Sequence, residues 1–463
     1  MAFDVFMESF CKHHQRAIIQ FRIIHIRINL VFFILFFLFA CSEDSQTDIT
    51  PPWVAYTQPN NGATSITTDT TVFIVYDKNI VLSDNYQITV NNEQTTASTN
   101  GKKLTIDCNL QAGTTYTINV SENSIQDIAG NYAKEYSFSF TTSAVTEPTF
   151  QIDDKLVTAT PSIEANNVYE FLKENFQSKI ISGTMANYNT NIIEAEWVHD
   201  QTGSWPALTG FDLIDYTRNW SWISYTDLVD NAITWWGNNG LVTISWHWRD
   251  PSRITDEFYS DKTNFDITKI YDENSDEYKA MIDDIDEIAS YLQQLKDAGV
   301  PVLWRPLHEA AGGWFWWGSK GAESCVSLWR LLFDRLVNVH GLNNLIWVWT
   351  TNTDSDALDW YPGDNYVDII GMDIYPGENQ HGSQYIQFDK VKEIFNGKKI
   401  ITLSECGSVP DPALMMEYGD TWSWFMPWNG NFTESDNHNG ADWWNKIFSY
   451  EYVLIRETMP NLK

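Results

Sequence analysis

The chain has 463 residues, of which 61 are acidic and 29 are lysine or arginine, so its net charge is −32 at pH 7. This length exceeds one average domain and predicts an N-terminal segment, one small domain and one large domain. The acidic surface excludes nucleic acid as a partner, disfavours direct binding to anionic membranes and argues against a polyanionic substrate.

The first 40 residues have the layout of a secretion signal. Basic residues at positions 12–27 precede an apolar run at 30–39, which is shorter than the ~20 residues of a spanning helix. The sequence Leu38-Phe39-Ala40-Cys41 resembles the lipobox of bacterial lipoproteins, so we expect a lipid on Cys41 and no other membrane attachment. The acidic Ser42-Glu43-Asp44 resembles that of lipoproteins exported to the outer-membrane surface of Bacteroidetes-like bacteria. The alternatives are an ordinary cleaved signal and a short membrane anchor.

Residues 51–142 contain short alternating runs separated by turn residues, and no helical pattern. The runs at 72–76, 86–90, 103–106, 115–120 and 136–140 predict strands, and their spacing predicts a β-sandwich. The Pro59-Asn60-Asn61-Gly62-Ala63 start and the Ile128-Ala129-Gly130-Asn131 turn resemble bacterial Ig-like domains. We interpret this domain as a spacer; glycan binding is the alternative, although exposed aromatic residues are few.

After a linker-like stretch at 143–161, the pattern changes to alternating strands and helices over residues 162–463. A helix is predicted at 276–298, ending at Gly299, because apolar residues recur there at spacings of three and four. Eight apolar strands in ~300 residues predict an α/β fold, a (β/α)8 TIM barrel. The predicted strands are 179–182, 207–211, 241–246, 302–306, 345–349, 367–372, 400–403 and 422–425.

Two glutamates stand at strand ends, where barrels of this kind place their active sites. Glu309 follows the fourth strand and Glu405 ends the seventh, so their carboxyl groups can flank one bond across the barrel. A retaining glycosidase needs such a pair ~5–5.5 Å apart, one residue as nucleophile and one as general acid/base. A single strand-end glutamate is more often structural, but the pair favours catalysis. Arg305, on the strand that leads to Glu309, is expected to keep Glu405 ionised.

The chain also has 22 tryptophans, clustered in segments such as Trp314-Phe315-Trp316-Trp317. Aromatic faces that stack on sugar rings account for this usage, and roughly half of the rings are expected in the core. The cysteines after Cys41 are Cys108, Cys325 and Cys406, which form no close pair and no zinc spacing. We therefore predict no disulfide framework and no metal site.

The segments around the two glutamates resemble glycoside hydrolase family 26, best known for β-mannanases. Arg305-Pro306-Leu307-His308-Glu309, with Gly313-Trp314-Phe315-Trp316-Trp317-Gly318 after it, is similar to the acid/base segment. Ser404-Glu405-Cys406-Gly407 is similar to the nucleophile segment, with Cys406 where a larger apolar residue often lies. The resemblance covers residues from about 162 to 460 and implies a retaining endo-β-1,4-mannanase acting on mannan, glucomannan or galactomannan without a cofactor.

The same resemblance implies substrate contacts at other strand ends. His247 is expected to line the −1 subsite, and His308 to bond the sugar or orient Glu405; a buried structural histidine is the alternative for both. Trp314 is expected to stack near the cleaved bond, with Trp316 and Trp317 packing beneath it. The further residues implied are Asp373 and Tyr375 as a substrate-bonding pair, the tyrosine also touching Glu405, and Trp360 and Trp428 in further subsites or in the core.

Three alternatives remain open. A mixed-linkage β-glucanase or a β-1,3-xylanase of the same family would have the same two glutamates, although the presence of His247 and Arg305 favours mannan. A surface glycan-binding protein on an inactive barrel is the third, and intact Glu309 and Glu405 argue against it.

The segment 253–273 is long enough to wall off a cleft, which would decide between endo and exo action. His438 and the acidic residues Asp283, Asp284 and Asp286 are interpreted as solvated charge. The sequence does not predict the oligomeric state.

Overall fold

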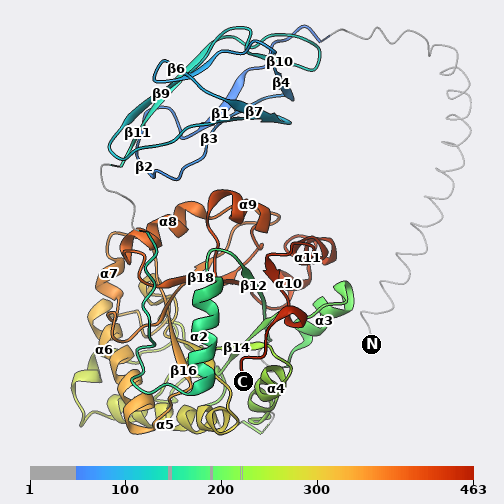
Figure 1. Ribbon diagram of the computed structural model, residues 1–463. Helices are drawn as coiled ribbons and strands as arrows, with labels where there is room; N and C mark the ends of the chain where they lie inside the picture. Colours follow the sequence, from blue (N-terminus) through green and yellow to red (C-terminus); the bar gives the residue numbers. More distant parts are fainter. Residues whose placement is uncertain (1–47, 144–148, 188–190, 219, 222) are drawn as a thin grey trace, which may run out of the picture. The chain divides into compact units, whose positions relative to one another are not determined.

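The computed structural model describes residues 48–143, 149–187, 191–218, 220–221 and 223–463 (Figure 1). The predicted signal segment and Cys41 lie outside the described residues. Two compact units are present, one containing Thr71–Asn109 and Thr115–Thr141 and the other Thr142–Lys463. No helix in the described part of the chain combines the length and apolarity needed to cross a bilayer.

The N-terminal unit is built from antiparallel strands. Alternate side chains of its longer strands point inward. Ile118 on β9(Thr115–Val120) pairs with Phe138 on β11(Tyr136–Thr142), and both are buried. The ring of Tyr116 stacks on Phe140, with centroids 5.6 Å apart. The five strands predicted from sequence are all present. The sheets, in spatial order, are β1(Val54–Gln58)-β3(Val72–Tyr76)-β8(Lys103–Ile106)-β7(Ala97–Asn100), β2(Ala63–Ile66)-β11(Tyr136–Thr142)-β9(Thr115–Val120)-β5(Ile88–Val90)-β6(Glu93–Gln94) and β10(Ile125–Asp127)-β4(Ile80–Leu82).

The second unit is a closed barrel of eight parallel strands, as predicted from sequence. The strands pair in chain order, and the pairing of β12(Ile180–Met185) with β13(Leu208–Asp212) closes the barrel. They are nearly continuous runs of buried residues, which a sheet covered on both faces requires. The barrel strands are β12(Ile180–Met185), β13(Leu208–Asp212), β14(Leu241–Trp246), β15(Val302–Pro306), β16(Leu345–Thr350), β17(Ile369–Ile374), β18(Ile400–Cys406) and β19(Trp424–Pro427), and β20(Val453–Leu454) also pairs with β12.

Helices pack around this barrel. The predicted helix at 276–298 is α5, which begins at the N-cap Ser275 and ends before Gly299, a glycine with φ of +69°. The α-helices are α2(Ile163–Asn175), α3(Ile193–Thr202), α4(Asp227–Gly237), α5(Asp276–Asp297), α6(Ala322–Phe333), α7(Ala357–Trp360), α8(Tyr385–Ile394), α9(Pro412–Tyr418), α10(Asn431–Glu434) and α11(Ala441–Phe448). Shorter turns are the 3₁₀ segments η1(Ile267–Tyr271), η2(Ala310–Gly312) and η4(Arg456–Thr458), and a π-helical η3(Asp334–Val339) follows α6.

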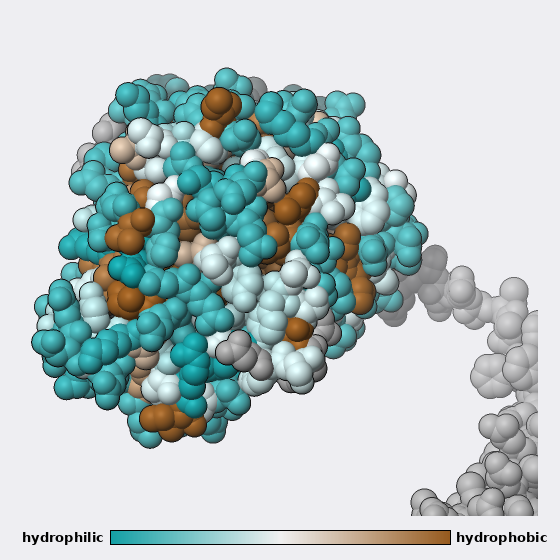
Figure 2. Space-filling view, turned by 90° about the horizontal axis from the view of Figure 1, so that it is seen from below, coloured by the Kyte–Doolittle hydropathy of each residue, from teal (hydrophilic) through white to brown (hydrophobic). Residues whose placement is uncertain are grey.

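The core of the barrel unit is rich in tryptophan. The largest fully buried side chains are Trp235, Trp246, Trp248, Trp304, Trp316, Trp317, Trp329, Trp347, Trp349, Trp422, Trp424 and Trp444. This confirms that about half of the rings belong to the core and that Trp316 and Trp317 are packing residues. The face seen in Figure 2 is mostly hydrophilic, with apolar residues in small separate patches, as the acidic composition leads one to expect.

One interpretation from sequence is wrong. Asp284 is not solvated helix charge, because its side chain on α5 is fully buried. It accepts a hydrogen bond from the Trp248 indole at 2.8 Å and pairs with Arg253 at 2.8 Å. Burial raises the pKa of Asp284 to about 7, against the effect of these partners. Asp286, two residues further along α5, is partly exposed and pairs with Arg335 and His340.

Candidate active site

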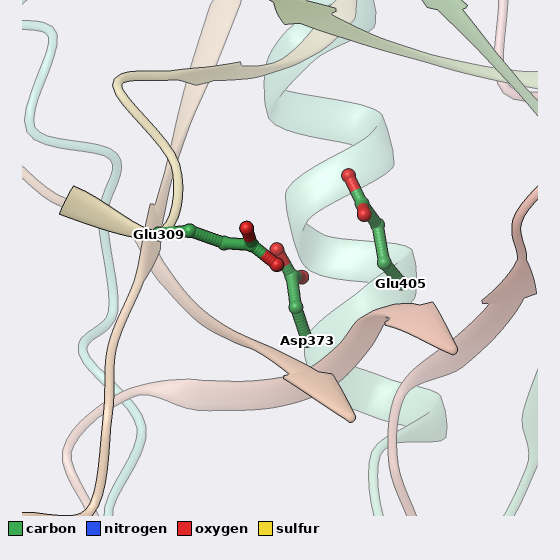
Figure 3. Close-up of side chains that lie close together, drawn as sticks. All are labelled: Glu309, Asp373 and Glu405. Carbon is green, nitrogen blue, oxygen red and sulfur yellow. The ribbon is translucent and has the colours of Figure 1, made fainter. Parts of the chain in front are cut away.

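Three carboxyl groups converge at the C-terminal ends of the barrel strands (Figure 3). Glu309 follows β15, Asp373 lies on β17 and Glu405 on β18. One carboxylate oxygen of each residue lies within 4.8 Å of one oxygen of both others. The fold thus brings together the two glutamates singled out in the sequence and Asp373, which was expected near them as a substrate contact.

Glu405 is held by hydrogen-bond donors on both of its oxygens. The Arg305 guanidinium donates to Oε1, and the Tyr375 hydroxyl donates to Oε2 at 2.7 Å, a contact that was expected from sequence. Arg305 is itself buried, only 1% exposed, and also bonds Thr350 at 3.3 Å. These donors fix the orientation of the carboxylate.

Asp373 shares the same arginine. Its Oδ2 accepts from Arg305 at 3.0 Å, and the side chain is almost fully buried. Burial raises the pKa of Asp373 well above its usual range; the Glu405 and Glu309 carboxyls add to this shift, while Arg305 opposes it.

Glu309 is held more loosely. It follows β15 in a left-handed backbone conformation, with φ of +54°, and opens η2. The one hydrogen bond to its carboxyl group among the described residues comes from the indole of Trp314, at 3.0 Å from Oε2, and that residue is 46% exposed. Burial raises the pKa of Glu309, and the negative charge of Glu405 raises it further.

His247 and His308 form a pair beside the carboxyl groups. Their Nε2 atoms lie 3.1 Å apart, so His308 faces His247, and no hydrogen bond joins it to Glu405 among the described residues. The other ring nitrogen of His247 bonds the Asp212 carboxylate, which also accepts from the His247 backbone N–H at 2.9 Å. Asp212 is buried at the end of β13. Sequence reasoning missed this residue, although the strand-end rule that found the glutamates applies to it.

Aromatic rings surround the histidine pair. Trp428, after β19, lies with its ring centroid 5.7 Å from that of His247, and Phe315 lies 5.5 Å from it. Trp317 donates to the His308 carbonyl at 3.0 Å and so supports the segment before Glu309. Trp360 lies apart in α7, is buried and donates to Asp356. No hydrogen bond or ring contact in the described chain joins Trp360 to the carboxyl groups.

The long loop after β14 borders the site on the Glu309 side. Its residue Ser260 donates from the backbone to the Trp314 carbonyl at 2.7 Å and from its hydroxyl to the Gly313 carbonyl at 2.8 Å. Tyr259 pairs with Phe315 in an isolated antiparallel bridge. The segment 253–273, expected to reach the cleft, therefore lies directly against the turn that carries Trp314.

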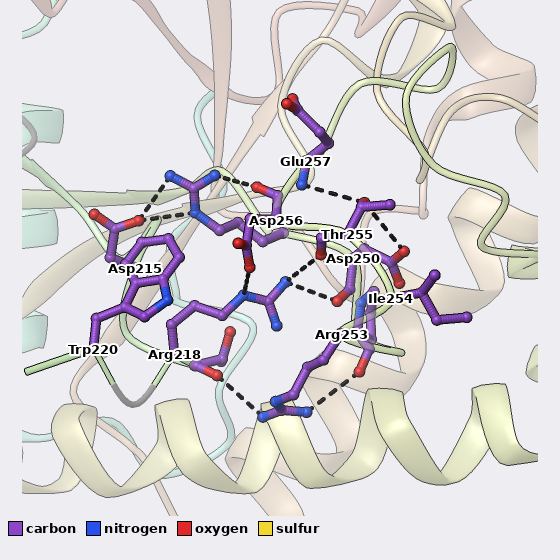
Figure 4. A network of polar contacts seen from close by, with 12 residues as sticks. Asp215, Arg218, Trp220, Asp250, Arg253, Ile254, Thr255, Asp256 and Glu257 are labelled. Carbon is purple, nitrogen blue, oxygen red and sulfur yellow. Dashed lines mark hydrogen bonds and ion pairs between the residues drawn. The ribbon is translucent and has the colours of Figure 1, made fainter.

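An arginine network anchors the base of this loop (Figure 4). Arg249 pairs with Asp215 at 2.8 Å, and Arg218 donates to the Asp250 carbonyl at 2.9 Å. Arg253 donates to the Thr217 carbonyl at 3.1 Å, besides its pairing with Asp284. The network ties the loops after β13 and β14 to α5.

Comparisons with known proteins agree with this geometry. The sequence model of glycosyl hydrolase family 26 matches residues 157–458, and that of a bacterial Ig-like domain matches residues 48–142. A mannan endo-1,4-beta-mannosidase of Thermothelomyces thermophilus is 38% identical over 327 residues, which are 68% of this chain and 65% of that protein. The chain thus spans slightly less than two thirds of the length of this relative.

Two solved structures are also similar. The β-mannanase of a symbiotic protist of the termite Reticulitermes speratus, complexed with a gluco-manno-oligosaccharide, is 41% identical with a TM-score of 0.64. The similarity covers 68% of this chain and 99% of that one. The Podospora anserina β-(1,4)-mannanase is 29% identical with a TM-score of 0.65, and 89% of this chain and 97% of that one are covered.

Proposed function

Because the chain belongs to glycosyl hydrolase family 26, we propose that it cleaves internal β-1,4 bonds of mannan, glucomannan or galactomannan with retention of configuration. Glu405 acts as the nucleophile and Glu309 as the general acid/base. The observation that carries the proposal is the approach of their carboxylate oxygens to within 4.8 Å. Oxygens within this limit fit the closely spaced carboxyl groups of retaining enzymes, ~5–5.5 Å apart, better than the ~6.5–9.5 Å spacing of inverting ones.

The first step needs Glu405 ionised and Glu309 protonated. Glu405 attacks the anomeric carbon while Glu309 gives its proton to the departing glycosidic oxygen, so one C–O bond forms as another breaks. Arg305 and Tyr375 aim the Glu405 oxygens, and the raised pKa of Glu309 keeps its proton available at a higher pH than for an ordinary glutamate.

The second step reverses these roles. Once Glu405 is an ester its negative charge is gone, and with it one cause of the raised pKa of Glu309. Glu309 then accepts a proton from a water molecule, whose oxygen attacks the anomeric carbon and releases Glu405 as a carboxylate. No residue outside the chain is needed for either proton transfer.

The substrate class is argued from the relatives and from the surroundings of the two glutamates. Relatives named as mannan endo-1,4-beta-mannosidases cover most of the barrel, and the acidic chain suits a neutral glycan. The half-exposed ring of Trp314 beside Glu309 offers a flat apolar face to a pyranose. Mixed-linkage β-glucan and β-1,3-xylan are the alternative substrates, and a glycan-binding protein without activity is the alternative function.

The test is hydrolysis by the chain from Glu43 onward, alongside Glu309→Gln, Glu405→Gln and the control Glu277→Gln on the outer first turn of α5. Galactomannan, glucomannan, mixed-linkage β-glucan and β-1,3-xylan are compared, with product size followed over time and the first anomer identified by NMR. We expect short manno-oligosaccharides of β configuration, lost in both active-site variants. Cleavage of another glycan alone would overturn the proposed substrate. An α-configured first product would overturn the retaining mechanism. Binding without cleavage would overturn the proposed activity.

We further propose that residues 1–40 are a signal, that Cys41 carries the lipid, and that the protein is displayed on the outer membrane with the Ig-like unit as a spacer. The lipobox-like sequence and the acidic residues after it support this address. Expression of the full chain with Cys41→Ala in a Bacteroidetes-like host is the test. We expect release from the membrane fraction and loss of labelled fatty acid; a variant that stays membrane-bound and labelled would contradict the proposal.

A further inference from the structure

Asp212 has no role in the proposed mechanism, yet its carboxylate is fully engaged next to the site. It accepts three hydrogen bonds, from the backbone N–H of His247, from the His247 ring and from the Ser245 hydroxyl at 3.1 Å. Two of these fix His247 both in position and in ring orientation. A buried carboxylate aimed at an imidazole Nδ1 requires that nitrogen to carry a proton.

The far side of the His247 ring faces other titratable groups. Its Nε2 lies 3.1 Å from Nε2 of His308, and the charges of Glu405 and Arg305 act on the ring from β18 and β15. Burial, the largest single influence, lowers the pKa of His247, but the charge and hydrogen bond of Asp212, together with the charge of Glu405, raise the pKa overall. Burial and then the charge of His247 lower the pKa of His308 well below its usual range. The two Nε2 atoms share one hydrogen bond, and the directions of the two pKa shifts favour a charged His247 as its donor and a neutral His308 as its acceptor.

We propose that Asp212 is a positioning residue that keeps His247 protonated and fixed beside the two glutamates, and that this positive charge sets the pH range of catalysis. The inference deepens the function proposed above and rests on it. Asp212 acts only through His247, since the described chain shows no contact between Asp212 and either glutamate. Its other charged neighbour is Asp215 at the start of the next loop, which is paired with Arg249.

The direction of the effect follows from the sign of the charge. A positive His247 lowers the pKa of Glu309, in opposition to burial and Glu405. Asp212→Asn keeps an oxygen that can accept from the His247 backbone but removes the negative charge, so His247 becomes neutral near pH 7. Glu309 then holds its proton to a higher pH. We expect the alkaline limb of the kcat/KM profile to move upward by on the order of one pH unit.

The first experiment uses the chain from Glu43 onward, labelled with ¹⁵N-histidine, and follows the ring nitrogens by NMR between pH 5 and 9. The variant His247→Gln identifies the signals of His247. It needs no substrate, so it remains decisive if the proposed hydrolysis fails. We expect a doubly protonated His247 at pH 7 in the parent chain and a neutral one in Asp212→Asn. A neutral His247 in the parent would overturn the proposal, even if the variant does not fold.

The second experiment records pH–rate profiles of Asp212→Asn, His247→Gln and the double variant. The control is Asp368→Asn. Asp368 is another buried carboxylate, which accepts hydrogen bonds from two backbone N–H groups at 2.7 Å and lies at the opposite end of the barrel strands. We expect a shifted alkaline limb in Asp212→Asn, no further shift on adding it to His247→Gln, and lower thermal stability without a shift in the control. An equal loss of rate at every pH, or a further shift in the double variant, would show that Asp212 does not act through the charge of His247.

Discussion

The two proposed catalytic carboxyl groups are held in opposite ways. Glu405 lies within strand β18, is 3% exposed and has a donor on each oxygen. Glu309 lies on a left-handed turn beyond its strand, and among the described residues its carboxyl group receives one hydrogen bond, from a half-exposed indole. A nucleophile must stay charged and fixed, whereas an acid/base must gain and lose a proton each turnover. The difference in support matches the difference in task.

Removing the Glu309 carboxyl gives the largest expected loss of activity that still distinguishes the acid/base from the nucleophile. Glu309→Ala should lower hydrolysis of mannan about 10²- to 10⁴-fold, since general acid/base catalysis contributes that much. An aryl glycoside with an acidic leaving group needs no proton, so its first step should persist as a rapid burst. Added azide should attack the ester without help from a base and restore turnover as a β-configured glycosyl azide. Equal losses on both substrates would contradict the division of roles.

The donors around Glu405 are tested by Arg305→Lys. Lysine keeps the charge but cannot bond Glu405 and Asp373 together in the planar geometry of arginine. We expect kcat/KM to fall about 10²-fold, through kcat more than through KM. The matched control is Arg330→Lys, whose guanidinium donates to the Pro362 carbonyl away from the site. A fall confined to KM would mean that Arg305 binds substrate rather than orienting the nucleophile.

The single donor to Glu309 should matter less. Trp314→Phe keeps an aromatic face but removes the indole N–H, which lowers the pKa of Glu309. Without it the pKa rises, so the alkaline limb of the pH profile should move upward while kcat/KM falls about three- to tenfold. Trp53→Phe, at an exposed position of the other unit, is the control. An alkaline limb that moves downward would refute this assignment of the donor.

Most of the barrel and the glutamate pair could be predicted because their signals are local. Buried parallel strands are continuous apolar runs, and a polar residue at the end of such a run marks the site. The ends of the strands were predicted less well. The predicted strand ended at 403 because the polar Ser404 and Glu405 interrupt the apolar pattern, whereas β18 continues to Cys406. Charges on a helix are usually solvated, which misled the interpretation of Asp284.

Partners distant in the chain were the part that the sequence could not supply. Asp212 and His247 are joined across two strands, and Asp284 is satisfied by Trp248 and Arg253 from a loop. Neither pairing has a fixed spacing that a pattern could reveal. From the sequence, Trp360 and Trp428 were equally good subsite candidates. Of the two, Trp428 has a ring contact with the site residue His247, whereas Trp360 bonds Asp356. The loops after β16 and β19 place the two rings differently.

The smallest expected effect on activity comes from Asp284→Asn, which tests whether the loop beside Glu309 depends on a remote charge. Burial raises the pKa of Asp284 in the folded chain to about 7, above its ordinary value near 4. The protonated form is therefore the one the fold favours. Its stabilisation is complete below pH 4, declines as the pH rises to about 7 and changes no further above that. Asparagine cannot titrate, so the stability of the parent relative to the variant should fall over this interval, as measured by urea unfolding at several pH values.

Activity on mannan should change less than twofold, since the loop keeps its bonds to Gly313 and Trp314. A stability difference that rises with pH would mean that Arg253 holds Asp284 ionised and that the network of Figure 4 is an ion pair at its centre.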